Sequence, residues 1–147
     1  MSGGSVRVFL DADTLVSGLL FRGNESVLLE LGRVGAVDLV ANFYVLEEVT
    51  RVLKREEFSI SSGEVQEVVK YVHVCVTVLE DPSSKDVGDN FSLLDDKKDI
   101  PVALMYRESD ADFLVTVDRE LLYKVKGSTT TKKLLKRILG GKTNETC

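Results

Sequence analysis

The 147-residue sequence contains one histidine, two cysteines and no tryptophan. Cys75 and Cys147 lie far apart, outside any spacing typical of a disulfide framework or a zinc site, which favours a reducing compartment. No apolar run approaches the roughly 18 residues of a membrane span, and no signal peptide is evident before Val6. We therefore expect a cytoplasmic protein that has no contact with a membrane.

Composition and charge indicate one globular domain with two electrostatically different parts. Hydrophobic residues make up 44% of the chain and charged residues 29%, which is ordinary for a folded domain. Residues 1–118 carry 11 basic and 22 acidic residues, a net charge of −11, whereas residues 119–142 carry eight basic residues and one acidic residue, a net +7. The two parts are expected to suit different partners.

The most informative stretch is the short apolar run that begins at Val6 and ends at Leu10. Its β-branched residues suit a buried strand, and it is followed at once by Asp11 and Asp13 and by a helical pattern. A strand of this kind delivers Asp11 to the carboxyl edge of an α/β sheet, where such sheets bind their ligands. We expect Asp11 to take part in chemistry.

Strand and helix patterns alternate along the rest of the chain, which predicts an α/β fold with a mainly parallel sheet and helices on both faces. The expected strands are residues 6–10, 37–41, 72–79 and 113–117. The lone His73 falls within the third of these and is interpreted as a strand residue. The expected helices are residues 14–21, 26–33, 43–55, 62–71, 100–108, 119–123 and 130–139.

The helix expected at residues 43–55 has the clearest apolar stripe, formed by Val45, Leu46, Val49, Val52 and Leu53. At about 100° per residue, Glu48 lies at the border of this stripe, whereas Glu47 faces solvent. Glu48 is therefore the better candidate to lean over a pocket.

Two further carboxylates occupy favourable positions. Asp118 follows the strand expected at 113–117, repeating the arrangement at Asp11, and Asp99 lies at the start of a helix, where an anion is stabilised. Carboxylates brought together in this way repel one another unless a cation neutralises them. Oxygen ligands without His or Cys favour Mg²⁺ or Mn²⁺, and such an ion suits phosphodiester hydrolysis.

Three stretches resemble the PIN-domain family, the fold of VapC-type toxins and related ribonucleases. In order they are LDADTLVSGLL, YVLEEVTRVL and DDKKDIPVALMYRESDADFLVTVDRELL, spanning roughly residues 6–124, and the last is the most specific. The resemblance assigns the family's four acids to Asp11, Glu48, Asp99 and Asp118, and its supporting polar residues to Asp13, Asp96 and Thr116. It implies a three-layer α/β/α fold with four to five strands and a metal held by Asp11, Asp99 and Asp118.

The same resemblance implies an endoribonuclease that depends on Mg²⁺ or Mn²⁺. Members of the family are commonly dimeric and often held by a cognate antitoxin, so RNA, an antitoxin and a second copy of the chain are the implied partners. The family usually has a fifth strand after the fourth acid's helix, but Leu122–Gly127 is too short and too basic to be a convincing one.

We expect the PIN-like domain to span residues 1–127, and residues 128–147 to form a basic helix and tail that pack on it or extend it. One face of this helix carries Lys132, Lys133, Lys136 and Arg137, which are suited to contact RNA phosphates. A solvated surface helix whose cations pair with the acidic body is an equally simple interpretation.

Two alternatives to the nuclease remain open. Asp11-Ala12-Asp13-Thr14 also fits the D-x-D-x-T motif of haloacid-dehalogenase-type phosphatases, in which Asp11 is the nucleophile and Asp13 the general acid/base. The Gly88-Asp89 pair that this family needs follows a polar loop instead of a strand. The other alternative is a catalytically idle PIN-like module that binds RNA or protein.

Overall fold

The computed structural model describes residues 5–81 and 99–140, except for the side chain of Asp99. Within them, a single parallel sheet contains the strands β1 (Arg7–Leu10), β2 (Asp38–Asn42), β3 (Val76–Leu79), β4 (Phe113–Val115) and β5 (Ser128–Thr129). The helices are α1 (Ala12–Leu20), α2 (Asn24–Arg33), α3 (Phe43–Leu53), α4 (Ser62–Cys75), α6 (Asp99–Glu108), α7 (Arg119–Lys124) and α8 (Thr131–Leu135). A 3₁₀ turn (Glu56–Phe58) follows α3, and a π-helical turn (Lys136–Gly140) follows α8.

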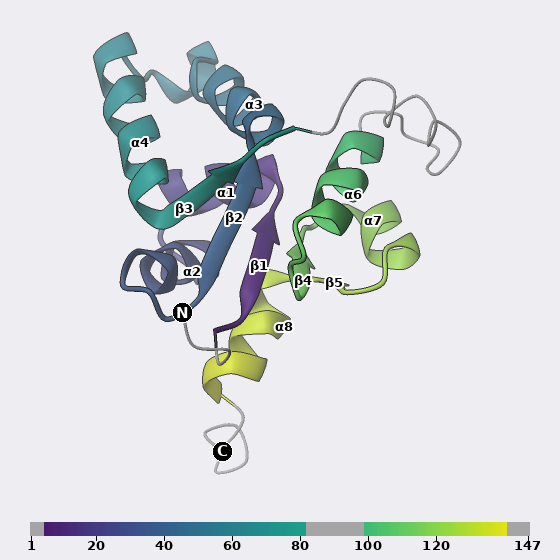
Figure 1. Cartoon of the computed structure of the whole chain (residues 1–147). Coiled ribbons are helices and arrows are strands. Elements are labelled where there is room, and N and C mark those ends of the chain that lie inside the picture. Colours follow the sequence, from purple (N-terminus) through teal and green to yellow (C-terminus); the bar gives the residue numbers. More distant parts are fainter. Residues whose placement is uncertain (1–4, 82–98, 141–147) are drawn as a thin grey trace.

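The strand order is β3-β2-β1-β4-β5, so the chain winds outward from β1 in one direction and then crosses back to wind in the other. Right-handed crossovers consequently place α1–α4 on one face of the sheet and α6 and α7 on the opposite face (Figure 1). Helix α8 packs against α2 on the first face. The three-layer α/β/α fold expected from the sequence is confirmed.

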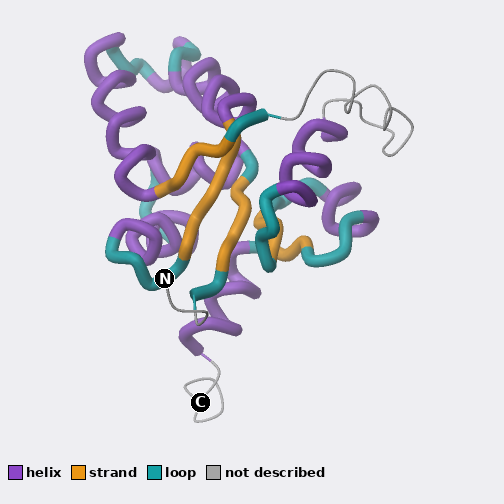
Figure 2. The backbone as a smooth tube through the Cα atoms, in the orientation of Figure 1, coloured by secondary structure: helices purple, strands orange, loops and turns teal. Residues whose placement is uncertain are grey.

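The reversal of winding occurs between β1 and β4, which are hydrogen-bonded neighbours. Figure 2 shows β1 and β4 side by side in the sheet. Since the connections from these two strands lead to opposite faces, a fold of this kind has a crevice at their carboxyl ends. The residues that follow β1 and β4 therefore line the natural ligand position of the fold. None of the helices in the described parts of the chain is long and apolar enough to cross a membrane.

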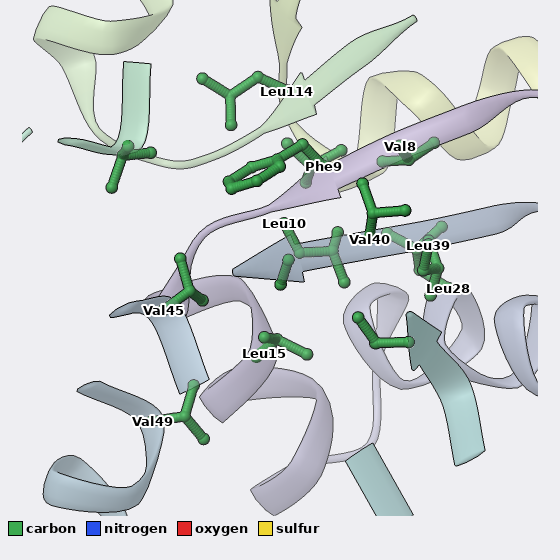
Figure 3. Close-up of a cluster of buried hydrophobic side chains, with 14 of the residues drawn as sticks. Val8, Phe9, Leu10, Leu15, Leu28, Leu39, Val40, Val45, Val49 and Leu114 are labelled. Atoms are coloured by element: carbon green, nitrogen blue, oxygen red, sulfur yellow. The ribbon is translucent and has the colours of Figure 1, made fainter. Parts of the chain in front are cut away.

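Strand β1 is the centre of the hydrophobic core. Val8, Phe9 and Leu10 are completely buried, because helices cover the sheet on both faces. Figure 3 shows these side chains among Val40 of β2 and Leu114 of β4. Complete burial on both faces explains why this strand is a continuous apolar run instead of an alternating one.

The strand expected at residues 72–79 is wrong in its first half. Helix α4 continues to Cys75, and β3 begins only at Val76. Val65, Val72 and Cys75 form the buried side of the helix, whereas His73 lies exposed in its last turn. A dense β-branched run does not by itself distinguish a strand from the buried end of a helix, so the helical spacing of the buried positions decides the outcome.

The structure also contains the fifth strand for which the sequence offered no convincing segment. Ser128 and Thr129, which precede the helix expected at residues 130–139, pair with β4, and the side chain of Thr130 caps α8 by accepting from the Lys133 N–H. Two residues are too few to show the alternation that identifies a strand. The segment expected to form a C-terminal helix and tail from residue 128 onward thus starts with a strand of the central sheet.

Gly127, just before β5, is required by two independent constraints. Its φ of +92° lies in the left-handed region, and an added Cβ would lie 2.1 Å from the hydroxyl oxygen of Tyr106. We expect Gly127→Ala to lower the free energy of unfolding by about 1–3 kcal/mol, measured by urea denaturation. Gly63→Ala is the matched control, since Gly63 lies in α4 with open space around it and alanine favours the helix there. Equal stability of the two variants would contradict the assignment.

Candidate active site at the carboxyl ends of β1 and β4

Asp11 is a buried carboxylate at the end of the central strand. Only 7% of the residue is exposed, and it serves as the N-cap of α1, with Oδ1 accepting from the backbone N–H of Thr14 at 3.0 Å. Burial raises the pKa of Asp11 above its ordinary value, and the charge of nearby Asp13 adds to the effect, although hydrogen bonds from Thr116 and Thr14 oppose it. Among the described residues, Asp11 forms no ion pair with a cation.

Thr116 connects the two strand ends. Its hydroxyl donates to Oδ2 of Asp11 and accepts from the backbone N–H of Asp118 at 3.0 Å. Because Thr116 is completely buried, this hydroxyl has one fixed environment. It therefore sets the position of Asp11 on one strand relative to the chain around Asp118 on the other.

Asp118 is the N-cap of α7, and its Oδ1 accepts from the Leu121 N–H at 3.0 Å. Together with Asp11, the exposed Asp13 and the half-buried Glu48, it lines one cleft of about 640 Å³. Glu48 comes from α3, at the border of a helix whose buried side is formed by Val45, Val49, Val52 and Leu53, as the wheel predicts. The structure thus places in the lining of one cleft four carboxylates that come from three separate parts of the sequence.

The other two predicted acids are not placed in this cleft by the structure. Asp99 is the first residue of α6, but its side chain lies outside the described residues, and so does the whole of Asp96. The described side chains alone contain no group of three carboxylates close enough to hold a metal ion. The prediction of Asp99 as the third ligand therefore stays a prediction.

The donor chemistry of the cleft fits Mg²⁺ or Mn²⁺. The available groups are carboxylate oxygens, which these ions prefer, and the described lining of the cleft contains neither His nor Cys. Asp11 is a buried carboxylate that pairs with no cation in the described part of the chain. Such a group is destabilising when ionised, and a bound cation would stabilise it.

The four basic residues of the C-terminal helix lie elsewhere. Lys133 and Arg137 line a separate groove beside β5, where the Arg137 guanidinium lies 5.1 Å from the centre of the Phe113 ring. Lys132 and Lys136 are exposed on the same helical segment. None of the four lines the acidic cleft. Their predicted RNA contact stays a prediction that concerns a different surface.

Three cleft residues were missed by the sequence analysis, namely Tyr44, Arg51 and Arg55. All three belong to α3 or immediately follow it, and with Glu48 they are spaced by four, three and four residues. This is the spacing of one helical face, so the signal was present once Glu48 had been chosen. Arg51 also forms an ion pair with Glu48.

The beginning of α3 is held by the end of β3. The Asn42 side-chain amide, just before the helix, donates to the backbone carbonyl of Glu80, and Asp81 Oδ1 accepts from the Tyr44 N–H at 2.9 Å. The first backbone N–H groups of a helix have no acceptor within the helix. Here the Asp81 carboxylate, from another segment, is the acceptor for the N–H of Tyr44. The wall that carries Glu48 is thereby attached to the sheet.

An all-parallel α/β sheet with an acidic crevice at its winding reversal defines a class of proteins whose ligand site lies at the strand ends. Comparison with known proteins makes the class specific. The family model described as "PIN domain" matches residues 7–120, and the chain belongs to that family, which is generally a nuclease fold.

The fold is also similar to the crystal structure of PAE2754 from Pyrobaculum aerophilum. The TM-score is 0.62 at 23% sequence identity, and the alignment covers 93% of this chain and 98% of that one. At this identity the similarity concerns the fold alone. None of the curated proteins matches the sequence.

Asp11→Asn should stabilise the protein in EDTA at neutral pH. The raised pKa means that the folded protein binds this proton more tightly than the unfolded chain does, so stability is lost as the pH rises through the folded-state pKa. Asparagine is an equally good N-cap and carries no charge. Urea denaturation should show a gain at pH 7 that disappears below about pH 4, the ordinary carboxyl value.

The control for this experiment is Asp13→Asn, which removes an exposed carboxylate from the same helix and should change the free energy of unfolding less. The same pH dependence in the wild type and in Asp11→Asn would show that the buried charge does not strain the fold.

Thr116→Val should destabilise the protein by about 1–3 kcal/mol, because it leaves Oδ2 of Asp11 and the N–H of Asp118 without this hydroxyl. Thr116→Ser keeps the hydroxyl and should recover most of the loss. Thermal and urea denaturation of both variants test this. If valine and serine were equally destabilising, packing of the methyl group would be the cause instead.

Proposed function

We propose that the protein is a metal-dependent endoribonuclease whose active site is the acidic cleft between β1, β4 and α3. The observation that carries the proposal is that the buried Asp11 and the half-buried Asp118 line one cleft at the winding reversal, together with Glu48. The family supplies the coarser statement that this is generally a nuclease fold.

In this proposal Asp11 and Asp118 hold Mg²⁺ or Mn²⁺ with Asp99 as the third ligand. When bound, the ion lowers the pKa of a water molecule and neutralises charge on the phosphoryl oxygens. Thr116 keeps Asp11 in position through its hydroxyl. Glu48, on the opposite wall, orients the attacking water and accepts its proton. Asp13 and Asp96 add negative charge without being required.

The finer proposals concern the biological setting. A role as the toxin of a toxin–antitoxin pair, restraint by a cognate antitoxin, a homodimer and a cytoplasmic location are all properties suggested by the family resemblance. They share one requirement, that the cleft cut RNA, and so the enzymatic test comes first.

The main competing proposal is an idle PIN-like module that binds RNA or protein. The intact set of acids weighs against it, since loss of activity removes the reason to keep a strained carboxylate such as Asp11. The phosphatase alternative has no support from the family model, and it requires a central role for Asp13, which is exposed.

The wild-type protein should cleave a mixed RNA pool in Mg²⁺ or Mn²⁺ and should be inactive in EDTA. Asp11→Asn and Asp99→Asn should each lower the rate by at least about 100-fold, because each removes a proposed metal ligand, and loss of even an outer-shell partner of a metal ligand costs about 10–100-fold. Asp13→Asn is the control and should retain most of the activity.

Gel analysis of the RNA products and isothermal titration with Mn²⁺ provide independent readouts. Metal binding without cleavage would favour the idle module. Loss of p-nitrophenyl phosphate hydrolysis in both Asp11→Asn and Asp13→Asn would favour the phosphatase.

A further inference from the structure

The acidic cleft contains two cations on the same wall as Glu48. Arg51 and Arg55 line it together with Tyr44, and all three come from α3 or the residues just after its end. We name Tyr44, Arg51 and Arg55 the α3 stripe. The other described residues that line the cleft are apolar or acidic, and the part of the chain before residue 119 has a net charge of −11. Within the described lining, the charges that attract a polyanion are therefore those of the α3 stripe.

We propose that the α3 stripe is the track along which a single RNA strand crosses the cleft, with Arg51 and Arg55 binding successive phosphates and Tyr44 stacking on an unpaired base. This inference rests on the proposed ribonuclease function and adds the residues that position its substrate. Tyr44 lies in the first turn of α3 and Arg55 just beyond its last, so the stripe extends for about 15 Å along the helix.

The ion pair between Arg51 and Glu48 suits this exchange. It joins two side chains that are 69% and 40% exposed, and pairs of this kind contribute little net free energy. A phosphate can consequently take the guanidinium from Glu48 at little cost, leaving the Glu48 carboxylate available to a water molecule. Arg55 follows the end of α3 and has no ion pair among the described residues.

Tyr44 favours a single strand over a duplex. The residue is 37% exposed at the cleft, and its backbone is fixed by the hydrogen bond to Asp81. Aromatic side chains bind single-stranded RNA by stacking on splayed bases, which a duplex does not offer. The combination of one aromatic ring and two guanidinium groups beside a carboxylate cluster matches the backbone and bases of an unpaired strand.

The test measures binding separately from cleavage. In the full-length Asp11→Asn background, which leaves RNA uncut, fluorescence anisotropy of a labelled unstructured 12-nucleotide RNA is recorded over a range of salt concentrations. Arg51→Gln and Arg55→Gln should each reduce the slope of log affinity against log salt by roughly 0.7, the value for one phosphate contact on a single strand. Lys54→Gln is the matched control, since Lys54 is exposed next to Arg55 but does not line the cleft.

Tyr44→Leu should weaken binding of the single strand about tenfold and leave duplex binding unchanged, whereas Tyr44→Phe should behave as the parent. Arg51→Lys and Arg55→Lys should keep the parental salt slope. Equal slopes for Arg51→Gln, Arg55→Gln and Lys54→Gln would overturn the track.

The two proposals fail in different ways. If the wild type cleaves RNA while the arginine variants keep the parental slope, the ribonuclease stands and the track is wrong. If no RNA is cut but Arg51→Gln and Arg55→Gln reduce the salt slope, the α3 stripe binds RNA as proposed and the protein is an idle binding module. A slope lost only in Lys133→Gln or Arg137→Gln would assign RNA binding to the groove beside β5 and overturn the track.

Discussion

The placement of one charged group, the Asp11 carboxylate, in the interior at the end of β1 constrains the whole active-site region. It is buried because β1 is the central strand and its neighbour β4 ends beside it. An ionised carboxylate without a cation is expensive in such a place. Two hydrogen bonds, from Thr14 and Thr116, partly offset the free energy of burying this charge. The Thr116 hydroxyl also accepts from the N–H of Asp118 and so holds the chain that follows β4. The buried charge of Asp11 therefore lowers the stability of the fold, while the same carboxylate is the group that suits a bound cation.

Helix α3 supplies the complementary part of the site. Its buried side belongs to the core, while residues at the border of that side place both Glu48 and the cations that suit a polyanion in the same cleft as Asp11. Placing opposite charges on one helical face keeps the acid and the guanidinium groups within reach of one another.

Much of this arrangement follows from the sequence by simple physical rules. The apolar run before Asp11, the repeat of that pattern before Asp118 and the wheel position of Glu48 predict the site because strand ends and helix faces are geometrically regular. The failures come from features that lack periodicity. Val72–Cys75 reads as strand on composition although it is helix, and β5 has only two residues.

Other features depend on tertiary contacts that no local pattern encodes. The capping of α3 by Asp81 joins segments 37 residues apart, and the position of Arg51 and Arg55 in the acidic cleft depends on how α3 packs against α1 and β2. The helical spacing of Arg51 and Arg55 from Glu48 is visible in the sequence. It indicates that both arginines line the cleft only once Glu48 is known to share that cleft with Asp11 and Asp118.

The shortness of β5 has a consequence for self-association. An edge strand exposes unpaired backbone groups that can recruit another chain, and proteins commonly protect such edges by keeping them short and by placing Lys or Arg beside them. Here the edge offers two residues, and the groove next to it is lined by Lys133 and Arg137. A second copy approaching through the same edge would gain few ladder hydrogen bonds and would bring like charges together. The short β5 and the positive charges of the C-terminal helix therefore disfavour extension of the sheet from one chain to the next at this edge.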